Sequence, residues 1–195
     1  MSPQARLGDM TRALIVIDVQ ESFRARPEWA LINDPKIADQ VNRLVRLARE
    51  AGDTVIWVLH SEPGSGDVFD PALGHVRLMS ELERRDGEPL VHKTSHNAFT
   101  TTNLQQELTQ RGVRELTVCG IRTEQCVETT TRVGSDLGYQ VTFVSDATAT
   151  NPITRDGVTL SAEEIVQRTV FALADRFATI ATVEELEQQA GEGAR

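Results

Sequence analysis

The chain has 195 residues, of which 39% are hydrophobic and 25% charged, the composition of an ordinary globular protein. Its 20 Lys and Arg against 29 Asp and Glu give a net charge of −9, which argues against nucleic acid and anionic membranes as partners. The polar N-terminus lacks the pattern of a signal peptide, and two cysteines are too few for a disulfide framework. We therefore expect one cytoplasmic domain over residues 1–195, with its core at about residues 12–182.

The N-terminal part of the chain predicts two strands that flank one helix. An apolar run at residues 13–19 is too short for a typical helix and ends abruptly, as buried parallel strands do. Apolar side chains at helical spacing fill residues 35–51, and Gly52 follows as a C-cap. A second short run, rich in β-branched residues, predicts a strand at residues 54–59.

The rest of the chain predicts a long loop and then a regular alternation of strands and helices. Residues 61–89 are rich in Pro and Gly, so we expect a functional loop with one short helix at residues 78–84. After this loop we expect strands at residues 90–92, 115–119, 140–144 and 178–180, helices at residues 104–110, 124–137 and 162–174, and a helical C-terminal tail. Strands that alternate with helices through short connections predict a parallel sheet with helices on both faces.

Reactive side chains occur at the ends of three expected strands. Asp18 ends the first strand, Lys93 directly follows the third, and Cys126 lies at the helix start beyond the strand at residues 115–119. In a sheet of this kind, ligands bind in the crevice beyond the carboxyl ends of the strands. The three side chains are therefore candidates for one functional site.

Each candidate also has a simpler interpretation. Burying a carboxylate in an apolar run is costly unless it is paired, so Asp18 marks either a functional site or a solvated strand end. Lys93 is either a crevice residue or an ordinary surface lysine. Cys126 is either a small buried hydrophobe or a nucleophile, since N–H groups at a helix start favour a thiolate and can hold an oxyanion. Cys119, inside a strand, is expected in the core.

Several other kinds of site lack support in the sequence. Cys119 and Cys126 do not form a CxxC redox motif. His92 and His96 have an H-x3-H spacing without a matching cysteine partner, and His60 ends the second strand alone, so we expect no metal. Glycine patterns for nucleotides and the G-x-S-x-G motif of serine hydrolases are also missing, so we expect no cofactor.

Three longer segments carry recognisable motifs. They read ALIVIDVQESF, VHKTSHNAFTTTNLQQEL and LTVCGIRTEQCVETTTRVGSDLGYQVTFVSDATAT. Together they resemble the isochorismatase-like cysteine hydrolases, over about residues 13 to 180. The resemblance implies a three-layer α/β/α Rossmann-like fold with a mostly parallel sheet of about six strands. It also implies hydrolysis of a small-molecule substrate by a cysteine nucleophile.

The residues that match the family's functional positions are the three candidates from the strand ends. The resemblance implies a catalytic triad of Asp18, Lys93 and Cys126. It further implies a cis peptide bond between Ile121 and Arg122, and an oxyanion hole made by the backbone N–H groups of Arg122 and Cys126. Family members are commonly oligomeric, so it also implies a homodimer or homotetramer.

The resemblance leaves the substrate pocket less defined. Gln20 and Phe23 are candidate pocket residues near Asp18. Arg122 is a departure, because small residues are common at its position in the family. It is either a pocket residue that binds a substrate carboxylate or part of a subunit contact.

One favoured function and three alternatives are compatible with these motifs. Isochorismatases proper, which cleave a vinyl ether, generally lack the nucleophilic cysteine, so Cys126 favours hydrolysis of an amide, ureido or lactam C–N bond. Nicotinamidases carry a D-x-H metal motif after the second strand, where this chain reads VLHSEPGSGDVF, with His60 but without the motif. An ether hydrolase, a nicotinamidase and an inactive binding protein on the same fold are the alternatives.

Overall fold

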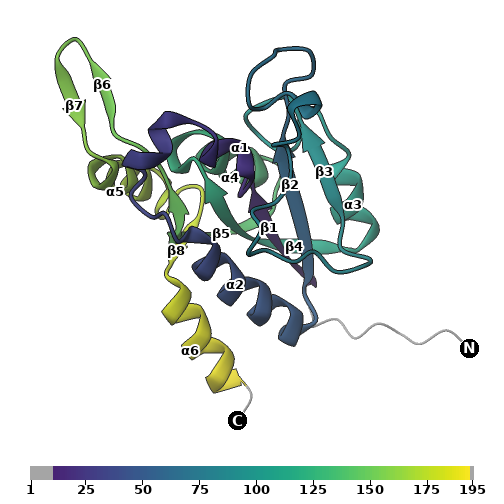
Figure 1. The fold of residues 1–195 in the computed structure, drawn as a ribbon. Coiled ribbons are helices and arrows are strands. Elements are labelled where there is room, and N and C mark those ends of the chain that lie inside the picture. Colours follow the sequence, from purple (N-terminus) through teal and green to yellow (C-terminus); the bar gives the residue numbers. More distant parts are fainter. Residues whose placement is uncertain (1–10, 194–195) are drawn as a thin grey trace, which may run out of the picture.

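A parallel sheet of six strands forms the centre of the protein (Figure 1). The computed structural model describes residues 11–193; the N-terminal segment, where we expect no signal peptide, lies outside these residues. The strands lie in the order β3-β2-β1-β4-β5-β8, and every neighbouring pair is parallel. The strands are β1 (Thr11–Ile17), β2 (Thr54–His60), β3 (Leu90–Lys93), β4 (Val113–Ile121), β5 (Gln140–Ala149) and β8 (Thr179–Ala181).

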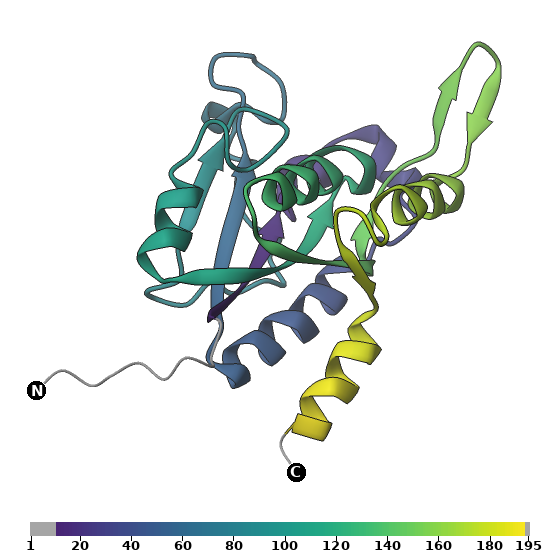
Figure 2. The same ribbon diagram turned by 180° about the vertical axis from the view of Figure 1, so that it is seen from behind.

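Helices cover both faces of this sheet (Figures 1 and 2). On one face lie α2 (Ile37–Ala51) and α6 (Val183–Gly193). On the other lie α3 (Leu104–Gln110), α4 (Glu128–Asp136) and α5 (Ala162–Leu173). The expected three-layer α/β/α fold is therefore confirmed. Within residues 11–193, none of the helices has the length and apolar character needed to cross a membrane.

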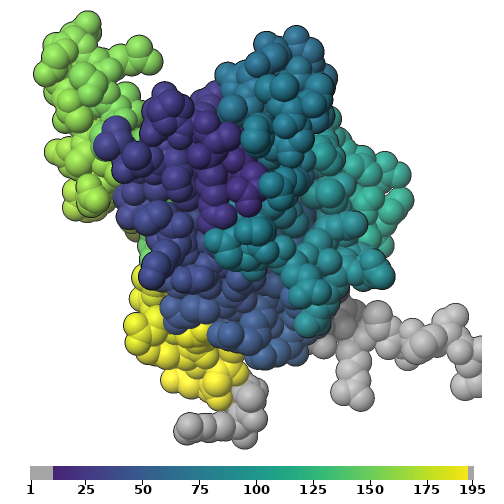
Figure 3. Space-filling view, in the orientation of Figure 1, coloured from purple at the N-terminus to yellow at the C-terminus, as the bar shows by residue number. Residues whose placement is uncertain are grey.

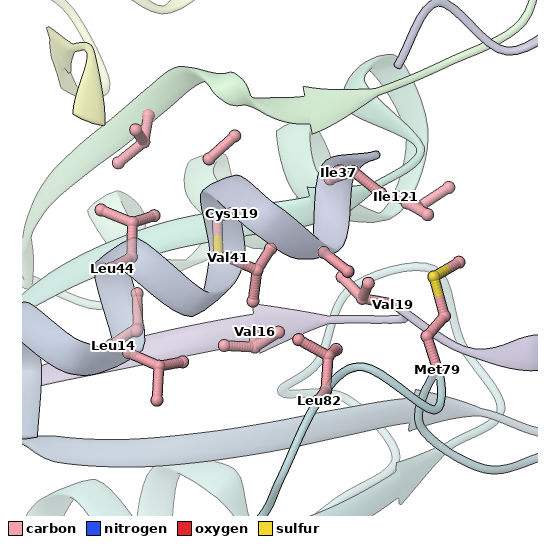
Figure 4. Packing of buried hydrophobic residues seen from close by; sticks show 14 of the residues in the cluster. Leu14, Val16, Val19, Ile37, Val41, Leu44, Met79, Leu82, Cys119 and Ile121 are labelled. Atoms are coloured by element: carbon pink, nitrogen blue, oxygen red, sulfur yellow. The ribbon is translucent and has the colours of Figure 1, made fainter. Parts of the chain in front are cut away.

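The central strand β1 supplies both layers of the core. Leu14 and Val16 belong to the buried cluster under α2 (Figure 4), whereas Ile15 and Ile17 belong to the cluster on the opposite face. Side chains alternate between the faces of a strand, so a strand covered on both faces is apolar throughout. Cys119 is fully buried in the cluster under α2, which agrees with the core position expected for it.

The backbone at the carboxyl ends of β1 and β4 has special conformations. Asp18 follows β1 with a φ of 54°, and its N–H donates to the Val58 carbonyl of β2 at 2.9 Å. Gly120 of β4 pairs with Ile17 and has a φ of 131°. A Cβ at Gly120 would lie 1.9 Å from the Ile17 carbonyl oxygen. Only glycine permits this close approach of the two strands next to Asp18.

The prediction of a helix at residues 78–84 is wrong. This segment instead runs beside the chain that follows β1, through an antiparallel bridge between Leu78 and Gln20. The Met79 N–H donates to the Val19 carbonyl at 3.1 Å, and the Met79 side chain is fully buried in the core. Pairing with the distant segment after β1 provides hydrogen-bond partners for backbone groups that a helix would otherwise satisfy. The apolar spacing of residues 78–84 does not report this pairing, so it predicted a helix incorrectly.

A two-stranded hairpin that we did not expect projects from the body (Figures 1 and 3). It consists of β6 (Ile153–Arg155) and β7 (Val158–Leu160), which pair antiparallel. Asp156 and Gly157 connect them with φ values of 51° and 77°. An Asp-Gly pair between β-branched runs is a hairpin signal, so this element could have been predicted from the sequence.

Three short helical turns were also not expected: α1 (Glu21–Arg24), η1 (Pro27–Leu31) and η2 (Pro71–Leu73).

Replacing Gly120 by Ala should strongly destabilise the fold, because the new Cβ would overlap the Ile17 carbonyl. We expect a loss of more than about 3 kcal/mol in the free energy of unfolding, measured by urea denaturation. Gly52→Ala is the matched control, since Gly52 also has a positive φ but has open space around it. That variant should lose only about 1–2 kcal/mol. Equal losses for the two variants would show that the strand contact is unimportant.

Candidate active site

The three residues predicted at the strand ends lie together in the structure. Asp18 follows β1, Lys93 is the last residue of β3, and Cys126 lies in the π-helical turn η3 (Thr123–Val127) after β4. Lys93 Nζ lies 2.7 Å from Asp18 Oδ2 and 3.3 Å from Cys126 Sγ. Asp18 and Lys93 are fully buried, and Cys126 is 7% exposed. The nucleophile candidate is thus the most accessible of the three.

The Lys93–Asp18 ion pair is the central electrostatic feature of the site. Moving either charge alone out of water costs several kcal/mol, and the attraction within the pair offsets this cost. Neither Asp18 oxygen makes a well-aligned hydrogen bond to a residue in the described range, despite the short distance to Nζ. Asp18 is therefore charge-compensated by Lys93 but retains the capacity to accept a proton.

Burial controls the protonation of Cys126 and Asp18. It raises the pKa of the Cys126 thiol to about 12; the charge of Asp18 raises it too, and Lys93 opposes both. Burial also raises the pKa of Asp18, and Lys93 opposes that shift. We expected the helix start to lower the pKa of Cys126 and favour a thiolate, but the effect of burial is larger and raises the pKa. A positive charge on Lys93 and one negative charge on either Asp18 or Cys126 make the buried site neutral overall.

The segment that carries Cys126 bends sharply between β4 and α4. The peptide bond between Ile121 and Arg122 is cis, at the position implied by the resemblance. The Arg122 carbonyl then accepts hydrogen bonds from the N–H groups of Gln125 (3.1 Å) and Val127 (3.2 Å). The helix expected at residues 124–137 thus starts as a π-helical turn, which continues into α4.

The Arg122 side chain has protein partners of its own. Its Nη2 lies 3.2 Å from Glu124 Oε1, and its Nε donates to Thr150 Oγ1 at 3.3 Å. Thr150 in turn donates to Glu124 Oε2 at 2.6 Å. The Arg122 side chain, 21% exposed, is therefore already paired with a carboxylate. Its suggested contact with a substrate carboxylate stays a prediction.

Gln20 and Phe23, the two candidate pocket residues that follow Asp18 in the chain, both contact other parts of the protein. The fully buried Gln20 amide donates to the His60 carbonyl at 3.0 Å and accepts from the His60 N–H at 2.8 Å. It therefore clamps the end of β2. The Phe23 ring packs edge-on against Phe69, with ring centroids 5.1 Å apart. A role of Gln20 and Phe23 in substrate binding stays a prediction.

His60 is an additional member of the site to which the sequence assigned no role. Its Nδ1 lies 3.2 Å from Lys93 Nζ, and its Nε2 lies 3.0 Å from Glu62 Oε1. The rule that selected the other strand-end residues also applies to His60, which ends β2. No motif in the sequence marks Glu62.

Removing the charge of Lys93 should destabilise the fold, because Asp18 would then be buried without a counter-ion. We expect Lys93→Met to lower the free energy of unfolding by about 3 kcal/mol near neutral pH, measured by urea denaturation. The loss should shrink at acid pH, where Asp18 folds in its neutral form. The double variant Asp18→Asn/Lys93→Met should recover most of the stability. A double variant as unstable as Lys93→Met would contradict the ion-pair interpretation.

The sequence matches the model of the isochorismatase domain over residues 12–185. This match and the parallel three-layer fold place the chain in the isochorismatase family of hydrolases.

The chain is similar in sequence to other members of the family, among them a streptothricin hydrolase and a nicotinamidase. The isochorismatase family protein YrdC of Bacillus subtilis is 31% identical over 90% of this chain and 94% of its own length. A streptothricin hydrolase of Streptomyces noursei is 35% identical over 73% of this chain and 51% of its own length. Nicotinamidase 3 of Arabidopsis thaliana is 29% identical over 89% of this chain and 86% of its own length.

Solved structures agree with this assignment. A hydrolase of the isochorismatase family from Chromobacterium violaceum superposes with a TM-score of 0.87 at 25% identity, covering 98% of this chain and all of its own. A cysteine hydrolase from Pseudomonas syringae superposes with a TM-score of 0.83 at 25% identity, covering 93% of this chain and 92% of its own.

Proposed function

We propose that the protein is a cysteine-dependent hydrolase that cleaves an amide, ureido or lactam C–N bond of a small molecule through a thioester intermediate. The observation that carries this proposal is the placement of one buried ammonium, Lys93 Nζ, against both Asp18 Oδ2 and Cys126 Sγ. This arrangement unites a base, a cation and a nucleophile at the carboxyl end of the sheet. The named activities of the streptothricin hydrolase and nicotinamidase relatives are also consistent with C–N hydrolysis.

The first step is transfer of a proton from Cys126 to Asp18. The two groups are close enough for each to contribute to the pKa of the other. The transfer moves the negative charge from the carboxylate to the sulfur, and Lys93 contacts both atoms, so the site stays neutral. A buried thiol with a raised pKa can thereby form a thiolate without losing a proton to solvent.

The second step is attack of the thiolate on the substrate carbonyl carbon. A C–S bond forms, and the carbonyl π electrons move to oxygen as a tetrahedral oxyanion. The backbone N–H groups of Arg122 and Cys126 are the proposed donors to that oxyanion, because the first N–H groups of a helix lack intrahelical partners. When the oxyanion collapses, the C–N bond breaks and Asp18 gives its proton to the leaving nitrogen.

The last step releases the acyl group. Asp18, again ionised, takes a proton from a water molecule, and the hydroxide attacks the thioester carbonyl. The C–S bond breaks, the acid product leaves, and Asp18 returns its proton to the sulfur, which regenerates the Cys126 thiol. A free thiol of this kind persists in a reducing compartment, so we place the protein in the cytoplasm. The homodimer or homotetramer implied by the resemblance stays a prediction.

Replacing Cys126 by Ala should reduce turnover to background while leaving the fold intact. The assay is a screen of amides, ureides and lactams for release of ammonia or amine, followed by mass spectrometry of quenched mixtures to detect an acyl group on Cys126. Cys119→Ala is the matched control, since Cys119 is the other free thiol and lies in the core. It should keep near-normal turnover. Full activity in Cys126→Ala would refute the proposed nucleophile.

The pH dependence of turnover should reflect the environment of Asp18. Asp18 must be ionised to accept the thiol proton, and burial raises its pKa above the ordinary value of 3.8. Activity should therefore fall with acidification at a pH above that value, since the protonated carboxyl cannot act as base. The measurement is kcat/KM against pH on the best substrate of the screen. An acid limb at or below the ordinary value would contradict the assignment of Asp18 as base.

A further inference from the structure

The imidazole of His60 lies between Lys93 and an acidic residue outside the triad. Lys93 Nζ is 3.2 Å from His60 Nδ1, and Glu62 Oε1 is 3.0 Å from His60 Nε2. The His60 side chain is 15% exposed, whereas Glu62 is 45% exposed. A chain of polar contacts therefore runs from the protein surface to the buried ammonium.

The partners of His60 determine its tautomer. An ammonium has only N–H donors, so Nδ1 must be the acceptor in its contact with Lys93. A carboxylate has only acceptors, so Nε2 must carry the proton that is donated to Glu62. A proton on Nε2 and an unprotonated Nδ1 together define the neutral Nε2–H tautomer of His60. Protonation at Nδ1 would remove the hydrogen bond and place a second positive charge beside Lys93.

The His60 residue is held firmly in this place. The buried amide of Gln20 binds both its backbone N–H and its carbonyl. Its ring packs edge-on against Phe69, with the ring centroids 5.4 Å apart. A clamped backbone and a packed ring leave the imidazole little freedom to move away from Lys93.

His60 provides the third close polar neighbour of the Lys93 ammonium. An ammonium has three N–H groups, and Nζ has three close polar neighbours on three different segments: Asp18 Oδ2, Cys126 Sγ and His60 Nδ1. The titratable and charged groups around Lys93 are thus Asp18 after β1, His60 at the end of β2 with Glu62 behind it, and Cys126 in η3. Without His60, one N–H would lose its acceptor and the ammonium could rotate away from the sulfur.

We propose that His60, oriented by Glu62, is a positioning residue that directs the Lys93 ammonium toward Asp18 and Cys126. This inference rests on the proposed function, because it assigns His60 an effect on the Cys126 thiolate. His60 acts through Lys93 and is not assigned a contact with the reacting atoms. The simpler alternative is that the imidazole only fills space between β2 and Phe69.

The test is the rate of Cys126 alkylation by iodoacetamide across a range of pH. The rate measures the thiolate population without needing a substrate. His60→Leu keeps an apolar side chain against Phe69 but removes the acceptor, and we expect the plateau rate to fall about tenfold, the cost of losing one hydrogen bond to a charged group. His60→Asn carries Oδ1 at the branch position of Nδ1 and should recover most of the rate.

His92→Ala is the matched control, because His92 is an exposed histidine on the same strand as Lys93 and directly precedes it. It should leave the alkylation profile unchanged. Thermal unfolding of each variant shows whether the fold is retained. A His60→Leu variant that is folded and alkylates with the wild-type profile would overturn the inference, as would a His60→Asn variant no faster than His60→Leu.

A second measurement does not depend on the reactivity of Cys126. Nitrogen-15 NMR of the His60 ring should find Nε2 protonated and Nδ1 unprotonated at neutral pH, and Glu62→Ala should weaken this preference more than Glu62→Gln. A proton on Nδ1 in the wild-type protein would overturn the inference. Failure of the wild-type protein to hydrolyse any amide, with the expected alkylation and NMR results, would refute the proposed function and leave the role of His60 supported.

Discussion

The buried ion pair between Lys93 and Asp18 is the contact on which the site depends. A fully buried ammonium is stable only beside a compensating charge, and Asp18 Oδ2 supplies it at 2.7 Å. The two residues come from strands that β2 separates, so the order of the sheet decides whether they meet. The positive φ of Asp18 and the close approach of Gly120 to Ile17 shape the strand ends around this pair. The close packing of the strand ends and the attraction between Lys93 and Asp18 therefore favour the same arrangement of the site.

In the proposed mechanism, this ion pair also explains how Cys126 can react although its pKa is raised. A reactive cysteine usually has a lowered pKa and partial exposure, whereas burial raises the pKa of Cys126 to about 12. The difference follows from Asp18, whose charge is already balanced by Lys93. Losing a proton to solvent would leave the buried site with a net negative charge, whereas moving the proton to Asp18 keeps it neutral. In the proposed mechanism, reactivity depends on where the Lys93 ammonium lies, and for this reason we assign a positioning role to His60.

The family assignment defines the scaffold more closely than the substrate. Relatives named as a streptothricin hydrolase and a nicotinamidase share the domain, so one parallel sheet accommodates different substrates. In this chain, the segments beyond the strand ends hold Arg122 and Glu124 in a paired network with Thr150. A substrate that uses Arg122 must compete with Glu124 for the guanidinium.

The sequence by itself determined most elements and the three triad candidates, because apolar periodicity reports burial and parallel sheets bind ligands at strand ends. Asp18, Lys93 and Cys126 could be selected before any distance was known. Only the tertiary structure decided that Lys93 contacts both partners, that burial keeps Cys126 protonated, and that His60 and Glu62 extend the site. The same holds for Met79, which pairs with Val19 in place of the expected helix. Local patterns record neither contacts between distant segments nor the desolvation of a charge, and both arise only when the chain is packed.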